Sequence, residues 1–320
     1  MKKILVVLLI LTFSLTLFAE GQAEKGKINY PTKPIHMVVP WAAGGGTDAV
    51  ARVLAKEAEP FLGTTIVVEN RTGGGGAVGH SAVSSAKPDG YLIGLTTVEL
   101  IIQPHIQDVP YSHEEMEPII QVNSDPASVT VRADAPWNTL EEFLEYARQH
   151  PGELQCSGTG YAGIWHIALL DLSQKSGTEF TFIPSTGAAP AITELLGGHI
   201  DFTTASPPEV AAQVEAGQLK ILAVSGSERH PNFPDVPTMA EQGYDVQTPV
   251  WRGVQAPKGT PQEIIDILHD AFKKSFESEA FKKTMNNVGL GMVYRNGEGF
   301  KKMIAESYDS FGEIVSAFDL

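Results

Sequence analysis

Three short loops carry the residues best suited to binding a ligand. The first runs from Pro40 to Asp48, PWAAGGGTD, and lies between an apolar segment and a segment with helical character. Successive glycines let the backbone approach a ligand closely, and the N–H groups that open a helix carry partial positive charge. The loop predicts an anion site, which Trp41 closes. The structural alternative is a flexible turn in which Thr47 caps the helix.

Two later loops repeat this arrangement. Cys156–Gly160, CSGTG, and Pro184–Gly187, PSTG, each place hydroxyl groups and glycine between a predicted strand and a predicted helix. Oriented backbone dipoles at short range outweigh distant charges that salt screens, so together the loops would attract a carboxylate. Each loop alone also fits ordinary turn chemistry. Their recurrence favours a binding cleft.

A fourth glycine-rich run, Gly74–Gly79, matches the dinucleotide-binding string G-x-G-x-x-G, and Glu99 follows it at the spacing of the acidic partner. However, Asn70–Gly73 separate the strand from the glycines, where the fingerprint needs a tight turn. A surface loop, or a loop that packs beneath the ligand, is the preferred interpretation.

Motifs for catalysis are missing from the chain. It contains no G-x-S-x-G, no H-x-x-x-H and no Walker string. The single cysteine, Cys156, is expected to behave as a small buried hydrophobe. His166 either points into the cleft or packs against a sheet. The sequence therefore predicts neither an enzyme nor a cofactor or metal site.

Composition narrows the class of protein further. The chain has 320 residues, which suggests two domains or one large divided domain. Its 23 basic and 38 acidic residues give a net charge of −15, which argues against a surface that binds nucleic acid. A single cysteine excludes intramolecular disulfides and multi-cysteine metal sites.

The N-terminus has the three-part layout of a secretory signal. Lys2 and Lys3 precede an apolar and hydroxylic run, Ile4–Phe18, which is too short to span a membrane. Small and polar residues follow, and cleavage after Ala23 is preferred to cleavage after Ala19. We expect residues 1–23 to be a signal peptide and the mature protein to work in the periplasm or another extracytoplasmic space. A retained anchor is the alternative.

Short β-branched runs alternate with segments of helical character, which predicts an α/β fold. The last segment restarts near residue 246. We expect two lobes, one from residues 28–122 and 250–320 and the other from residues 123–249, joined by crossings near Gln121–Val131 and Tyr244–Trp251. The predicted strands span 35–40, 65–69, 91–97, 153–157, 179–183, 201–204 and 219–225, and the predicted helices span 47–61, 77–86, 161–176, 188–196, 207–216 and 299–318.

Two capping patterns fix further helix starts. Thr139 with Glu142 has the spacing of a capping box. Thr260, Pro261 and Glu263 predict an N-cap, a proline at the first helical position and a completed box.

Taken together, an ordered set of segments resembles the substrate-binding proteins of the tripartite tricarboxylate transporters, the Bug family. The set is Tyr30–Ile35, Pro40–Asp48, Val68–Arg71, Pro88–Tyr91 and Ala256–Pro261. The resemblance implies a two-lobed, type II-like periplasmic-binding-protein fold, or "Venus flytrap", with two mixed sheets and flanking helices. It also implies a monomeric receptor that delivers a small organic di- or tricarboxylate to large and small integral-membrane subunits driven by an ion gradient. The alternatives are a carboxylate sensor that feeds a signalling system and an exported dinucleotide-binding enzyme.

The resemblance also implies the ligand contacts. Asp48 matches an acidic position whose role is to hold the loop, since a bare carboxylate repels an anion. Arg252 stands where relatives have other residues, and it is expected to neutralise a second carboxylate when the lobes close; its alternative is a surface ion pair. The expected ligand-binding residues are Trp41, Gly45, Gly46, Thr47, Asp48, Ser157, Thr159, Gly160, His166, Ser185 and Arg252.

Overall fold

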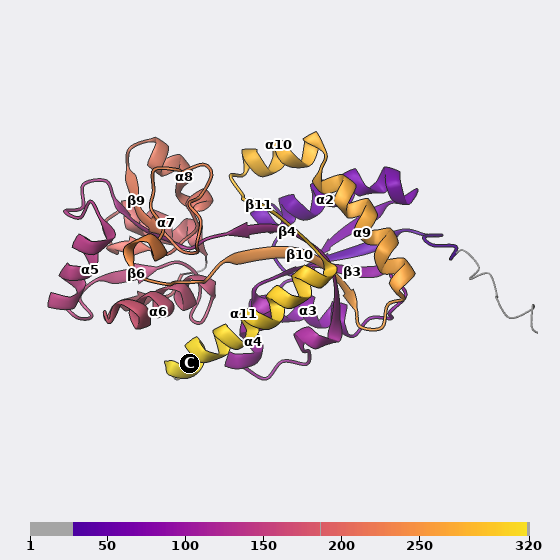
Figure 1. The fold of residues 1–320 in the computed structure, drawn as a ribbon, viewed down its shortest axis with the longest axis horizontal. Coiled ribbons are helices and arrows are strands. Elements are labelled where there is room, and N and C mark those ends of the chain that lie inside the picture. Colours follow the sequence, from indigo (N-terminus) through magenta and orange to yellow (C-terminus); the bar gives the residue numbers. More distant parts are fainter. Residues whose placement is uncertain (1–27, 186, 319–320) are drawn as a thin grey trace, which may run out of the picture.

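The computed structural model describes residues 28–185 and 187–318, so the predicted signal peptide lies outside the described residues. Two mixed β-sheets form the centres of two lobes (Figure 1). The first sheet has the strand order β11 (Met292–Asn296), β4 (Met116–Asp125), β10 (Val250–Pro257), β3 (Leu92–Thr97), β1 (Ile35–Val39) and β2 (Ile66–Asn70). The second has the order β7 (Thr181–Ile183), β6 (Gln155–Ser157), β8 (Phe202–Thr203), β5 (Ser128–Arg132) and β9 (Leu219–Val224).

Helices cover both faces of the first sheet. Strand β1 pairs in parallel with β2 and β3, whereas β10, β4 and β11 are antiparallel to their neighbours. One face packs against α2 (Gly46–Leu62), α9 (Gln262–Phe276) and α10 (Glu279–Asn287). The other packs against α3 (Ala77–Ser84), α4 (Glu99–Ile106) and α11 (Gly297–Ala317).

Helix α2 illustrates why these segments fold as they do. Val50, Leu54 and Ala58 recur at helical spacing and are fully buried against the sheet. The helix ends at Gly63, whose φ of 66° suits the left-handed C-terminal position. The opposite end of α2, with its glycines, lies beside the second lobe.

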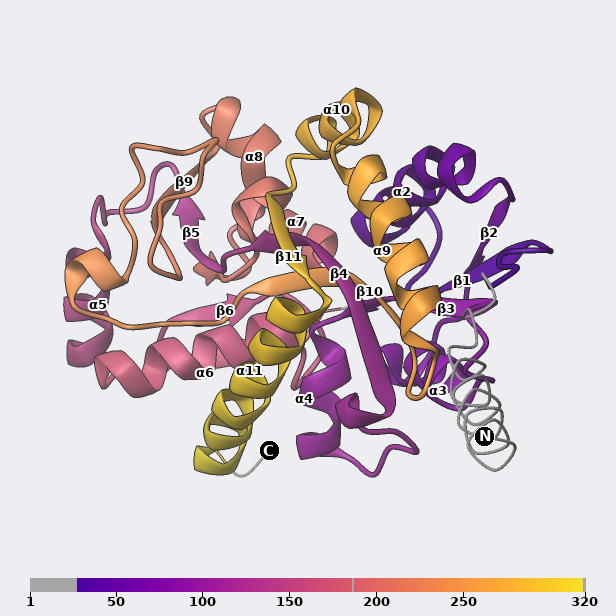
Figure 2. The same cartoon turned by 45° about the vertical axis from the view of Figure 1, so that its right-hand side comes forward.

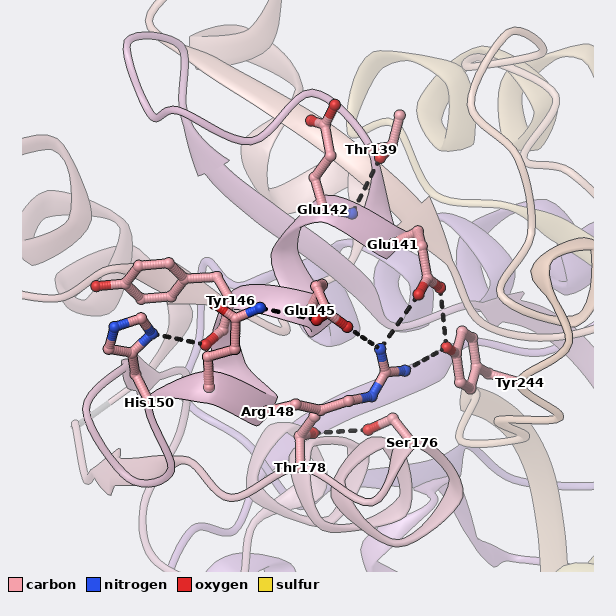
Figure 3. Close-up of polar contacts among 11 residues, drawn as sticks. Thr139, Glu141, Glu142, Glu145, Tyr146, Arg148, His150, Ser176, Thr178 and Tyr244 are labelled. Atoms are coloured by element: carbon pink, nitrogen blue, oxygen red, sulfur yellow. Dashed lines mark hydrogen bonds and ion pairs between the residues drawn. The ribbon is translucent and has the colours of Figure 1, made fainter.

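The second sheet is covered in the same way. Helices α5 (Leu140–Gln149) and α6 (Ile164–Ser176) pack on one face, and α7 (Ala188–Leu196) and α8 (Pro207–Glu215) pack on the other. The chain enters this lobe between β4 and β5 and leaves it just before β10. Tyr244 is still bonded to α5 through Arg148 and Glu141 (Figure 3). The return to the first sheet therefore begins after Tyr244 and is complete at Val250.

The two lobes share an apolar seam, which we define as Ile101 of α4, Ile167 of α6, Trp251 of β10 and Phe311 and Ile314 of α11. These residues belong to one hydrophobic cluster and are nearly or fully buried. Figure 2 shows α11 running beside α4 toward α6. Helix α11 covers the first lobe and also contacts the second one through α6.

The predicted α/β class and two mixed sheets are confirmed, and the helix predicted at 188–196 matches α7. Strands β4, β5 and β11 and helices α4 and α10 were not predicted. The Thr139 cap is confirmed by a bond from Glu142 N to Thr139 Oγ1 (Figure 3), although the Glu142 carboxylate returns to the Asn138 amide.

The predicted start of α9 is wrong. Pro261 is the N-cap and the helix begins at Gln262. The Thr260 hydroxyl donates instead to the Pro257 carbonyl, because the chain is still in the turn that leaves β10.

Candidate ligand-binding cleft

A cavity of about 240 Å³ lies between the two lobes, where α2, β10 and α8 converge. Its first-lobe wall comes from Gly44, Gly45, Gly46, Ala49, Asp125, Val250, Arg252, Val288 and Leu290. Its second-lobe wall comes from Trp165, Ser206, Pro208 and Glu209.

The N-terminus of α2 opens onto this cavity without a side-chain cap. Gly45 is the N-cap residue, and no side chain bonds the first amides of the helix. Asp48 turns inward, where its carboxylate accepts hydrogen bonds from Gly44 N, Arg52 Nε and Asn70 Nδ2, each at 2.9 Å. Burial opposes the charge, but these donors lower the pKa of Asp48 below its ordinary value. The carboxylate therefore fixes the loop and leaves the helix amides free for a ligand.

Arg252 lies on β10 beside this loop. Its Nε donates to Thr47 Oγ1 at 2.9 Å, and its Nη1 donates to Asn123 Oδ1 and, at 3.4 Å, to Asp125 Oδ2. Only 13% of the Arg252 side chain is exposed. Among the described residues, Nη2 has no hydrogen-bond partner, and it lies close to Gly46. The guanidinium is therefore held rigidly with one edge available to a ligand.

Two carboxylates also line the cavity, and they differ in how they are bonded. Asp125 is buried, and both of its oxygens are occupied, by Gly291 N and by Asn123 Nδ2 with Arg252. Glu209 is exposed to the cavity, and its Oε2 accepts from the amide and hydroxyl of Ser206. Desolvation by the surrounding protein raises the pKa of Glu209.

The second-lobe loop after β6 packs behind the cavity wall. A methyl group added at Gly158 would lie 2.5 Å from Cβ of Trp165, which lines the cavity, so this position requires glycine. The hydroxyl oxygens of Ser157 and Thr159 are buried and have no hydrogen-bond partner among the described residues. Unbonded buried hydroxyl groups are uncommon, and they favour a ligand or water nearby.

The start of α6 resembles that of α2. Its N-cap is Gly163, again without a side-chain hydrogen bond. Ala162 has a φ of 57°, unusual for a residue with a side chain, and its amide donates to His166 Nδ1 at 3.0 Å. His166 is buried and stacks on Phe182. Its burial lowers the pKa to about 4, so the neutral ring holds the loop from behind.

The expected site residues thus separate into three groups. Gly45, Gly46 and Arg252 line the cavity. Trp41, Thr47 and Asp48 adjoin it and are held by internal bonds, Trp41 through its Nε1 to Thr97 Oγ1. The second-lobe residues lie outside its lining; these are Ser157, Thr159, Gly160, His166 and Ser185, with the Ser185 amide bonded to the Thr159 carbonyl.

Sequence reasoning missed Asp125, Trp165 and Glu209. The only signal for Glu209 was the string Ser206-Pro-Pro-Glu209, which is typical of a helix start and forms a capping box at α8.

The dinucleotide motif is used for packing. A methyl group at Gly79 would lie 2.7 Å from Cα of Pro40, so this glycine allows α3 to approach the first loop. Glu99 is buried and accepts a bond from Thr97 Oγ1. Cys156 is fully buried, which raises the pKa of its thiol to about 12 and agrees with the predicted apolar role.

A short loop between α10 and β11 reaches across the cavity. Gly291 is fixed to β4 through Asp125 Oδ1 and Asn123 Nδ2. A methyl group at Gly289 would lie 3.2 Å from Cβ of Pro208 in the other lobe. Residues 288–290 therefore lie between the first lobe and the start of α8, at the edge of the cavity.

Residues 50–320 match the family model described as "Tripartite tricarboxylate transporter family receptor". The chain belongs to this family. Among its relatives, the Bordetella pertussis protein BugT is 32% identical over 295 residues, which are 89% of each chain. Family members are solute-binding receptors, and solved ones include a protein described as the periplasmic binding protein BugD.

Solved structures of the family share the fold. A TctC solute-binding protein from Polaromonas is 38% identical with a TM-score of 0.82, covering 90% of this chain and 99% of its own. MatC from Rhodopseudomonas palustris, solved with malate, is 26% identical with a TM-score of 0.76, covering 89% and 100%. A second protein of that organism, solved with adipate, is 26% identical with a TM-score of 0.78, covering 90% and 98%. Within the described part of this chain, no helix has the length and apolar character needed to cross a membrane.

Proposed function

We propose that this receptor captures a small organic carboxylate between its lobes and delivers it to the large and small integral-membrane subunits of a transporter. The observation that carries the proposal is the pairing of the free Arg252 Nη2 edge with the uncapped start of α2 at one cavity. The sequence predicts that Arg252 neutralises a second carboxylate. Because its Nη2 lies close to Gly46, we propose instead that the guanidinium and the helix amides act on the same carboxylate. The unbonded Ser157 and Thr159 hydroxyl groups lie behind the second-lobe wall and supply further hydrogen-bonding capacity on that side of the cavity.

Family membership and the malate and adipate in solved relatives support a di- or tricarboxylate as the ligand class. Export through residues 1–23, an extracytoplasmic location and a monomeric state complete the proposal. The proposed lobes are residues 28–122 with 250–320 and residues 123–249, with β4 carrying the first sheet on to Asp125. The proposed site includes the eleven residues expected from the sequence.

Calorimetry with citrate and with C4 to C6 dicarboxylates tests this function. We expect Arg252→Gln to weaken the best ligand about tenfold to hundredfold, because a charge-assisted hydrogen bond is lost. Lys56→Gln is the matched control, since it removes a positive charge from an exposed position on α2. Unchanged affinity in Arg252→Gln, or equal losses in both variants, would contradict the proposed site.

A further inference from the structure

The cavity presents opposite charges from opposite lobes. Arg252 Nη2 faces it from β10, and the Glu209 carboxylate faces it from the first turn of α8. Both side chains have one polar atom without a partner among the described residues, Nη2 on the arginine and Oε1 on the glutamate, whereas their other polar atoms are bonded.

Asp125 does not add a further free acceptor to the cavity. It is the anionic neighbour of Arg252, and both of its oxygens are already bonded. It therefore compensates part of the guanidinium charge and offers no free acceptor. Glu209 is the lining carboxylate that keeps one oxygen, Oε1, without a partner among the described residues, although Arg252 and Ser206 both favour its charged form.

A ligand carrying only carboxylates would satisfy Arg252 and leave Glu209 facing an anion. Like charges at short range in a partly desolvated site disfavour binding. A ligand with an amine beside its carboxylate would satisfy both free atoms at once, with N–H donors toward Oε1 and carboxylate oxygens toward Nη2.

We propose that the preferred ligand is an amino acid, held by its carboxylate at Arg252 and by its protonated amine at Glu209. This inference rests on the proposed function, because it takes the same cavity as the binding site, and it adds the class of substrate.

The test compares matched ligands by calorimetry at pH 7, namely succinate with aspartate and glutarate with glutamate. We expect the amino compound of each pair to bind the native protein roughly tenfold more tightly or better, the scale of one charge-assisted hydrogen bond. In Glu209→Gln, which keeps the size of the side chain, this preference should fall to about threefold or less. Glu215→Gln is the control, because Glu215 is exposed at the far end of the same helix.

The Glu209 side chain also bonds Ser206, so folding of Glu209→Gln is checked by its circular dichroism and melting temperature. Glu209→Asp, which keeps the charge, provides the second variant and should retain more of the preference for the amine. Equal binding of both compounds in each pair, with affinity still dependent on Arg252, would overturn this inference alone. Loss of all dependence on Arg252 would overturn the proposed function instead.

Discussion

His80 is a buried histidine on α3, and its only hydrogen bond within the described residues is donated by the Thr97 amide to Nε2. Desolvation lowers its pKa to about 3, and His166 behaves in the same way with a pKa of about 4. In the unfolded chain both titrate near 6.5. Below that value the unfolded chain binds more protons than the folded one.

We therefore expect the free energy of unfolding to fall as pH decreases from about 6.5 to about 4.5. The variant His80→Gln, which keeps an acceptor near Nε2, should show a dependence that is shallower by up to about 1.4 kcal/mol per pH unit. Urea unfolding at several pH values measures this slope separately from any constant loss of stability. A slope equal to that of the native protein would show that His80 titrates normally.

Helix starts differ in whether a side chain caps them. Side chains cap α5, α10 and α11, through Thr139, Ser278 and Asn296. Glycines without side-chain bonds precede α2, α6 and α7, the helices that follow the three predicted binding loops, and also precede α3. A helix start without a side-chain cap is less stable, and its backbone N–H groups remain available to a ligand.

Exchanging a cap and a glycine tests this division. Gly45→Ser should raise stability by a few tenths of a kcal/mol, because its φ of −81° and ψ of 172° suit a capping serine. Its hydroxyl would compete for the amides of α2 and weaken carboxylate binding about threefold to tenfold. Thr139→Ala on α5 should do the reverse, lowering stability by about 1 kcal/mol with unchanged affinity. Parallel thermal melts and calorimetry decide the matter, and equal affinity in Gly45→Ser would contradict the role of α2.

At this scale the sequence predicted most elements, because buried β-branched runs and helical periodicity are local signals. It missed α4, whose apolar sequence includes Pro104, and the exposed strand β11, whose residues lack alternation. The predicted N-cap of α9 at Thr260 was wrong because the local signal was ambiguous. A threonine before a proline fits an N-cap by type, but its hydroxyl bonds the preceding turn.

The apolar seam makes the two lobes one folding unit, because α4, α6, α11 and β10 contribute to a single cluster. Replacing Phe311 by alanine should cost about 3–5 kcal/mol. Calorimetric scans should still show one transition at a lower temperature, since both lobes lose a shared core. Two separate transitions in the native protein, or an unchanged midpoint for one lobe, would show that the seam does not couple them.

The site depends on this whole-molecule arrangement, which limits what the sequence could predict. The loop before α2 was recognisable because its glycines are consecutive. Arg252 and Glu209 come from different lobes, and only folding brings them to one cavity. No spacing along the chain relates a strand of one sheet to a helix on the other.

Residues 288–290 add a kinetic consequence to this arrangement. Gly289 lies close to Pro208 of the other lobe, while Gly291 is bonded to Asp125 of β4. Separation of the two lobes also separates these two residues. Val288 and Leu290 of the same loop line the cavity, so a substitution here is expected to change both the dissociation rate and the fit of the solute.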